Sequence, residues 1–178
     1  FNLDKDLTPV AAAARAEASA AVLDETAHAA TAPPSDPAAE RLTRVQAHLE
    51  AGALRGRAAI ANAKLAYALF QERFSSDRWR ALEARGGRVQ RPLWASTSTK
   101  NPAYRDVMYV EQLIGPRSVN TLPQATLEAF RDHGETKRTV DQGLDEAAKT
   151  IERLEAAGVS MQEVTDKLLA EGLASFQK

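Results

Sequence analysis

Two short segments of this chain have the character of β-strands, and each lies between segments with a helical pattern. The first, Pro92–Ser96, is apolar at its end, and a proline is tolerated at the first residue of a strand. The second is Ser118–Thr121. Strands that alternate with helices pair in parallel through βαβ crossovers. Because two strands cannot bury both faces of a parallel sheet, we expect further strands from residues before Phe1 or from another chain.

The clearest helical pattern lies between residues 53 and 74. Apolar side chains recur there at steps of three and four residues, at Ile60, Ala63, Tyr67, Phe70 and Phe74. Such a stripe predicts an amphipathic helix that packs against a broad apolar surface, such as a sheet or a barrel wall.

The rest of the chain is predicted to be largely helical. The expected helices cover 9–29, 38–51, 77–84 (with Trp79 and Leu82 inward), Asn101–Ile114, Pro123–His133, 141–157 and the residues after a Ser160/Glu163 capping box. A Pro-rich loop is expected at 31–37. We divide the chain into an alanine-rich helical segment, 1–52, and a C-terminal portion, 53–178.

Length and composition exclude several classes of protein. A chain of 178 residues is shorter than the roughly 250 of a (β/α)₈ barrel, and it starts at Phe1, so we expect a partial chain. A net charge of −1 gives no excess of positive charge of the kind that binds nucleic acid or an anionic membrane surface. The absence of cysteine removes thiolate chemistry and fits a cytoplasmic location. No apolar run is long enough for a membrane span.

The stretch from Ala95 to Pro102 is the strongest candidate for a binding site. It follows the first strand, contains four hydroxyls and the ammonium of Lys100, and ends at a predicted helix start. Hydroxyls, free backbone N–H groups and a cation are the donors that bind phosphate oxygens, which favours a phosphate site that includes Ser96, Thr97 and Lys100. An ordinary polar turn has the same composition. The polar neighbours of Lys100 argue against a nucleophilic lysine, which needs desolvation or a cationic neighbour.

Other polar residues offer weaker hypotheses. Asn120 ends the second strand and has two interpretations, a contact with a sugar hydroxyl or a position in the barrel wall or helix cap. His28, His48 and His133 are far apart and show no metal-ligand spacing, so no metal site is expected. His133 is interpreted as a charge partner for the C-terminus of its helix.

Several of these segments resemble the bacterial transaldolases. Arg55–Tyr67 is similar to the long helix after the sixth barrel strand of that family, and Arg91–Pro102 to the seventh strand and its loop. The segments Tyr109–Pro116 and Val119–Pro123 are similar to the following helix and the eighth strand. The resemblance covers about residues 53–178, and more weakly the residues from about 20.

The resemblance implies an α/β fold, a partial TIM (β/α)₈ barrel made of the last two βα units and C-terminal helices. It implies transfer of a dihydroxyacetone unit between sedoheptulose 7-phosphate and glyceraldehyde 3-phosphate, in the pentose phosphate pathway. A strand lysine forms a Schiff base in that family, and no cofactor or metal is used. Lys100 matches a basic residue that holds the sugar phosphate, and Ser96 and Thr97 line the same mouth.

The chain also departs from the family. No motif like the family's Ile-Lys-Ile-Pro-Ala-Thr occurs, and residues 1–18 do not resemble the Ser-and-Arg phosphate segment of the sixth strand. We therefore expect the Schiff-base lysine upstream of this chain and no turnover by the chain alone. The parent chain could be fused to a glucose-6-phosphate isomerase. The alternatives are a non-catalytic helical scaffold or binding module derived from a barrel, and a related sugar-phosphate aldolase.

Overall fold

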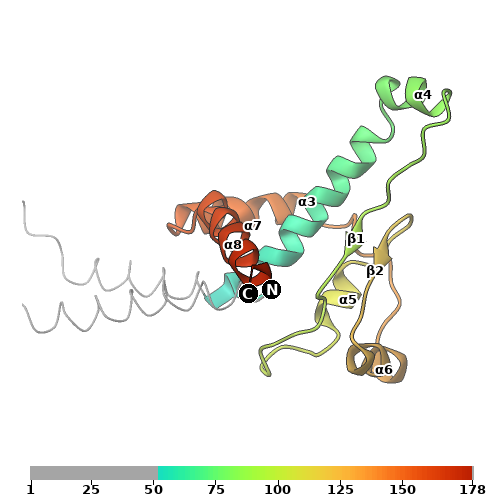
Figure 1. The fold of residues 1–178 in the computed structure, drawn as a ribbon. Helices are drawn as coiled ribbons and strands as arrows, with labels where there is room; N and C mark the ends of the chain where they lie inside the picture. Colours follow the sequence, from blue (N-terminus) through green and yellow to red (C-terminus); the bar gives the residue numbers. More distant parts are fainter. Residues whose placement is uncertain (1–51, 178) are drawn as a thin grey trace, which may run out of the picture. The chain divides into compact units, whose positions relative to one another are not determined.

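The computed structural model describes residues 52–177 (Figure 1), so the helices expected over 9–29 and 38–51 and the loop at 31–37 lie outside the described residues. The described part is mostly helical, with one two-stranded sheet. Its elements are α3 (Ala58–Arg73), α4 (Asp77–Glu83), β1 (Leu93–Trp94), α5 (Met108–Gln112), β2 (Val119–Asn120), α6 (Gln124–His133), α7 (Leu144–Ala156) and α8 (Met161–Phe176).

The chain divides into two compact units. One spans Gly56–Ile151 and contains α3 to α6, both strands and the first part of α7. Among the described residues, the other comprises 52–55 and 152–177, which include α8. Apart from the cap of α8, the polar and apolar contacts discussed below lie within the first unit.

The two strands pair in parallel, as their alternation with helices predicts. Leu93 is in register with Val119, and Trp94 with Asn120. The amide of Val119 donates to the carbonyl of Pro92, and a further bond from Thr121 to Trp94 closes the ladder. The strands are shorter than expected. β1 stops early because Ser96 has a φ of 58°, a left-handed conformation that breaks the extended backbone.

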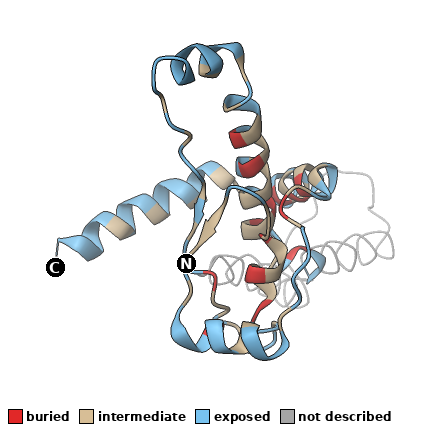
Figure 2. Cartoon of the chain, turned by 90° about the vertical axis from the view of Figure 1, so that its right-hand side faces the viewer, coloured by how far each residue is buried: buried red, intermediate tan, exposed pale blue. Residues whose placement is uncertain are grey.

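The core of the first unit forms on the aromatic face of α3, and Figure 2 shows buried residues along this helix. Tyr67 and Phe70, from the predicted stripe, are buried with Leu113 and Val140, and Trp94 packs against this cluster. The rings of Tyr67 and Phe70 lie 5.8 Å apart between centroids, and those of Tyr67 and Trp94 lie 6.5 Å apart. Such contacts add to the free energy of area burial. The core therefore joins α3 to β1 and to the end of α5.

The helix predicted to begin at Asn101 begins later. Asn101 Oδ1 accepts from the amide of Ala103, and the amide of Tyr104 donates to the carbonyl of Asn101, which closes a single turn. α5 begins at Met108 and contains five residues. The intervening Arg105 contacts α5 and the end of α6 through its side chain instead of continuing a helix.

The starts of α6 and α8 agree with the signals in the sequence, whereas α3 starts at Ala58 and α7 at Leu144, later than predicted. Pro123 precedes α6, which ends at His133, and Ser160 caps α8 by accepting from the amide of Glu163 at 3.3 Å. Ser76 caps α4, and the Trp79 ring packs on that of Phe74. The inward position predicted for Leu82 is wrong, since its side chain is exposed and α4 has no buried residue. A short helix outside the core has no surface against which to bury it.

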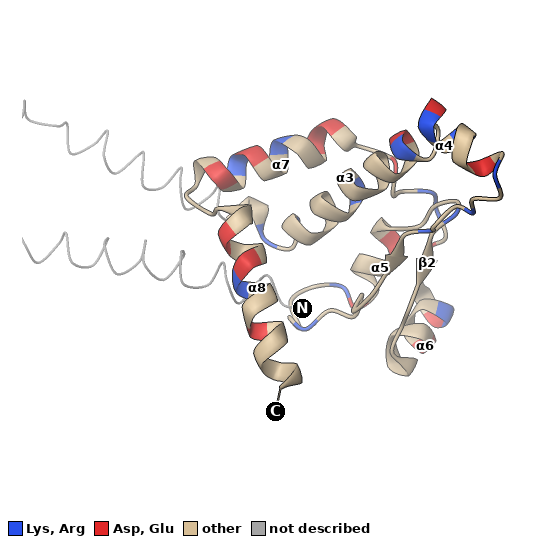
Figure 3. Cartoon of the chain, turned by 45° about the horizontal axis from the view of Figure 1, so that its top comes forward, with Lys and Arg blue, Asp and Glu red and all other residues tan. Residues whose placement is uncertain are grey.

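Charged side chains of both signs are spread along α7 and α8, as Figure 3 shows. Every helix between residues 52 and 177 is too short or too polar to cross a membrane.

Candidate functional site

The carboxyl ends of β1 and β2 lie at the same edge of the sheet because the strands are parallel. The segment that leaves β1 at this edge contains the hydroxyl-rich residues singled out by the sequence, and the segment that leaves β2 begins with Thr121. In parallel α/β folds, ligands bind at this edge of the sheet. The candidate site is therefore built by the segment that follows β1, over Thr97–Asn101, and by the end of β2.

Thr97 and Asn120 are brought together across the two strand ends. Thr97 is buried, with 4% of its surface exposed, and its Oγ1 donates to Asn120 Oδ1 at 2.9 Å. The carbonyl of Thr121 lies farther away, 3.5 Å from the same hydroxyl. This contact spans 23 positions of the sequence and links the segment after β1 directly to β2.

Lys100 pairs with Ser98, a residue absent from the predicted set. The exposed ammonium of Lys100 donates to Ser98 Oγ at 2.8 Å. Because the serine oxygen accepts this bond, its own proton is free to donate, and Lys100 retains two further N–H donors. Two donor groups thus lie side by side at the strand edge, which is an arrangement that suits an anion. The sequence shows only that the two residues are two positions apart, and whether their side chains meet depends on the path of the backbone, which bends at Ser98.

Ser96 is exposed and occupies the left-handed backbone conformation already noted. A residue with a Cβ adopts this conformation at a cost of about 1–3 kcal/mol, and keeps it where the surrounding structure holds it there. Of the four predicted residues, the structure thus pairs Thr97 with Asn120, pairs Lys100 with Ser98, and places Ser96 at the bend before them.

The helix N-terminus that we predict directly after Lys100 is absent from that position. α5 starts at Met108, eight residues beyond Lys100, and the Asn101 side chain caps the isolated turn before it. The contribution of a helix dipole to anion binding, expected from Asn101-Pro102, is therefore wrong for the described structure. Side-chain donors remain, and they carry the electrostatic part of the site.

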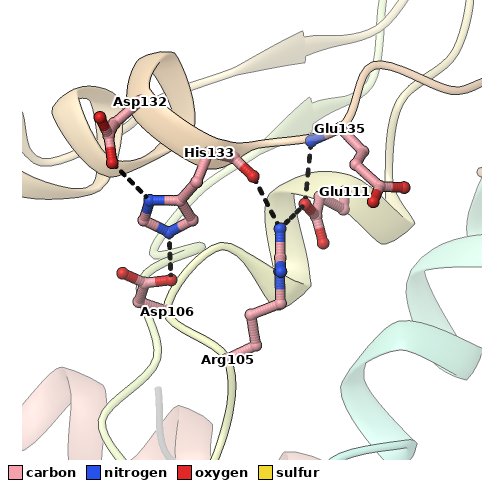
Figure 4. Close-up of polar contacts among 6 residues, drawn as sticks. All are labelled: Arg105, Asp106, Glu111, Asp132, His133 and Glu135. Atoms are coloured by element: carbon pink, nitrogen blue, oxygen red, sulfur yellow. Dashed lines mark hydrogen bonds and ion pairs between the residues drawn. The ribbon is translucent and has the colours of Figure 1, made fainter.

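A second polar cluster joins the segment before α5 to the end of α6 (Figure 4). Arg105 donates to Glu111 Oε1 and to the carbonyl of His133, both at 2.8 Å, and the amide of Glu135 donates to the same carboxylate oxygen. His133 contacts Asp106 through Nε2 at 2.9 Å and Asp132 through Nδ1 at 3.1 Å. These contacts make the cluster a bridge between two elements.

The charges of this cluster act on one another. The hydrogen bond to Asp106, and then that to Asp132, raises the pKa of His133 above its ordinary value of 6.5. The hydrogen bond from His133 lowers the pKa of Asp106 below its ordinary 3.8. His133 is the last residue of α6, as its interpretation as a C-terminal charge partner requires. Among residues 52–177, no group of three or more potential metal ligands comes together.

Burial lowers the pKa of Lys64 below its ordinary value, and the attraction of Asp141 opposes this shift. Its Nζ donates to the carbonyl of Gln142 at 3.0 Å. It lies on α3, outside the segments that follow the strands, so its environment is that of a packing residue.

Comparisons with known proteins agree on one family. The family model for transaldolase/fructose-6-phosphate aldolase matches residues 23–178. A transaldolase from Mycolicibacterium smegmatis is 50% identical over 130 residues, which cover 72% of this chain and 35% of that protein. A transaldolase from Thermobifida fusca is 49% identical over 140 residues, 78% of this chain and 38% of that protein. The chain thus spans little more than a third of the length of these curated relatives.

Proposed function

Because the chain belongs to the transaldolase/fructose-6-phosphate aldolase family, we propose that it is the C-terminal part of a transaldolase. The parent enzyme transfers a dihydroxyacetone unit from sedoheptulose 7-phosphate to glyceraldehyde 3-phosphate, in the pentose phosphate pathway of the cytoplasm. The two parallel strands and their helices are the last two βα units of its barrel. Support comes from the family match and from the parallel pairing of β1 with β2.

The role of this part is to hold the phosphate end of the sugar. The observation that carries the proposal is the pairing of Lys100 Nζ with Ser98 Oγ at the carboxyl edge of the strands. An ammonium and a hydroxyl that donate to one phosphate form charge-assisted bonds, each stronger than a neutral hydrogen bond. Ser96 and Thr97 belong to the same segment and shape it.

The Schiff-base lysine belongs to a strand outside this chain. A lysine nucleophile must lose its proton near neutral pH, which requires an apolar or cationic environment. Lys100 is exposed beside a hydroxyl, and Lys64 lies on α3, where its ammonium donates to the carbonyl of Gln142. The chain alone is therefore inactive, and turnover requires the missing strands. The chemistry needs no cofactor or metal.

A chimera tests this proposal. Residues 53–178 replace the matched segment of the Mycolicibacterium smegmatis transaldolase, and the activity of the product is measured. In the active chimera, Lys100→Ala should raise KM for phosphorylated substrates by about tenfold to a hundredfold, which corresponds to the loss of one bond to a charged group. Trapping of the substrate on the enzyme by borohydride should survive at saturating substrate.

The matched control is Lys137→Ala, which removes an exposed lysine from the connector after α6 and should leave KM within twofold. Loss of borohydride trapping in Lys100→Ala at saturating substrate would make Lys100 the nucleophile and refute the assignment. An unchanged KM in the same variant would refute the phosphate role. A chimera that folds but has no activity would contradict the transaldolase assignment itself.

A further inference from the structure

We propose that Thr97 and Asn120 are positioning residues, whose hydrogen bond holds the segment after β1 so that Ser98 and Lys100 face one anion. This pair is called the Thr97–Asn120 clamp below. The identity of the anion rests on the proposed function, but the clamp itself rests on the geometry of the two strand ends.

Because Thr97 is buried, its hydroxyl contacts other protein atoms and is not open to a ligand. Its side chain has one hydroxyl proton, and the closer acceptor is Asn120 Oδ1, at 2.9 Å against 3.5 Å for the Thr121 carbonyl. A phosphate oxygen would have to displace Asn120 and enter a buried position to receive that proton. Thr97 therefore acts on the segment and not directly on a ligand.

The strand register places Asn120 on the side of the sheet that faces the core. Residues in register on paired strands point to the same face. Asn120 is in register with Trp94, which packs against the core cluster and lies 6.5 Å from the Tyr67 ring. The opposite face carries Leu93 and Val119. Asn120 is thus directed toward the helix layer, where it meets Thr97, and it acts as the anchor of the clamp.

The position of the clamp in the sequence makes it effective. Thr97 directly precedes Ser98 and lies three residues before Lys100, and the left-handed bend at Ser96 directly precedes it. That bend persists only where neighbouring contacts hold it. With the clamp intact, the Ser98 and Lys100 donors start from a fixed backbone, so less conformational entropy is lost when an anion binds.

Backbone dynamics test the clamp without any ligand. In the 178-residue chain, Thr97→Val keeps the shape of the side chain and removes its hydroxyl. NMR order parameters for the amides of Ser98 to Lys100 should fall from about 0.85 to below about 0.6, while those of α3 stay constant. Asn120→Leu should have the same effect. The double variant should lose no more order than either single variant, because one hydrogen bond needs both partners.

Two further variants separate the clamp from general damage. Asn120→Asp retains an acceptor for the Thr97 hydroxyl and should keep the segment ordered. Thr121→Val removes a hydroxyl that donates to the Trp94 carbonyl at 3.4 Å, at the same strand end, and should also leave the order parameters unchanged. Unchanged order parameters in both Thr97→Val and Asn120→Leu, in chains whose α3 signals are intact, would overturn the proposal.

Titration with inorganic phosphate separates the clamp from the proposed function. The unmodified chain should bind phosphate saturably, Lys100→Ala should abolish the binding, and Thr97→Val should weaken it by roughly threefold to tenfold. If the unmodified chain does not bind phosphate, the phosphate role fails and the order parameters still decide the clamp. If Thr97→Val loosens the segment but binds phosphate as tightly as before, the clamp has no positioning role.

Discussion

Gly115, three residues after the end of α5, lies against Val140 in the linker before α7. A Cβ at this position would be 2.2 Å from Val140 Cγ1, and Val140 is fully buried in the core cluster. The neighbouring Pro116 carbonyl accepts from the Tyr67 hydroxyl at 2.8 Å, which keeps the chain close to α3. The glycine is therefore required for space, because its neighbour cannot move without disturbing the core.

Gly115→Ala should lower the free energy of unfolding by about 1–3 kcal/mol, the usual cost of an added methyl group in a packed core. Val140→Ala removes the methyl group in the way, so the double variant should be more stable than the sum of the two single effects predicts. Urea denaturation measures all three. Gly172→Ala is the matched control, since nothing lies within 4 Å of that site, and it should not destabilise the chain. Additive effects of Gly115→Ala and Val140→Ala would show that the contact is not the cause.

Sequence patterns predict only one of the two reasons for a glycine at position 115. The helix predicted over Asn101–Ile114 stops just before Gly115, where glycine and proline are local signals for a helix end, and α5 indeed ends before it. The contact with Val140 joins positions 25 residues apart, and no local pattern contains it. The same limit applies at the site, where the hydroxyl-rich stretch was evident but the partner of Lys100 depends on the path of the backbone.

At the scale of elements, α5 and α6 are joined by the polar cluster around His133. Arg105, Asp106 and Glu111 approach from the α5 side, and Asp132 and Glu135 flank His133 on the α6 side (Figure 4). Helix periodicity predicted α6 well, because its start at Pro123 and its end at His133 are local signals. It extended α5 too far toward Asn101, because it could not foresee that Arg105 and Asp106 bind the end of another helix.

The cluster should make stability depend on pH. The pKa of His133 is raised in the folded chain, so its contribution is complete below about pH 6.5, the unfolded value, and is lost as pH rises through the folded pKa. The pKa of Asp106 is lowered, so its contribution is present above about pH 3.8 and is lost as pH falls through the folded pKa. The pair is therefore strongest between these two values.

We expect the melting temperature to fall between pH 6 and pH 8 by more in the unmodified chain than in His133→Gln or Asp106→Asn. Thermal unfolding at several pH values, followed by circular dichroism, measures the difference. An NMR titration of His133 should also show its pKa returning toward 6.5 in Asp106→Asn. Equal pH dependence in all three chains would mean that the His133–Asp106 contact does not contribute.

At the scale of the whole molecule, the order of elements was predictable and their pairing only partly so. Alternation of strands and helices correctly predicted a parallel pair, because crossover connections favour that direction. Strand length was overestimated, since β1 ends at Trp94 and the left-handed bend at Ser96 lies two residues further on. The sheet has two strands among the described residues, and the relatives are nearly three times as long as the matched segment. In the proposed parent enzyme, further strands pair with this sheet.

A substitution of Leu93 tests whether further strands complete this sheet in the parent enzyme. Its side chain points to the face opposite Trp94 and is 55% exposed. In a closed barrel this face is filled by side chains from neighbouring strands. Leu93→Ala should therefore change the free energy of unfolding of the 178-residue chain by less than about 0.5 kcal/mol, as at other surface positions. In the chimera with the Mycolicibacterium smegmatis enzyme, the same substitution should cost about 2–5 kcal/mol, because it leaves a cavity.

Leu82→Ala on α4 is the matched control, since Leu82 is exposed and lies outside the sheet. It should have a small effect in both proteins, because the added strands do not cover a surface helix of this kind. Urea denaturation of the four variants and their two parents gives the comparison. A buried leucine costs more to truncate than an exposed one, so only burial by the added strands can separate the two Leu93 values. If Leu93→Ala has the same effect in both proteins, the β1–β2 sheet is not part of a closed barrel.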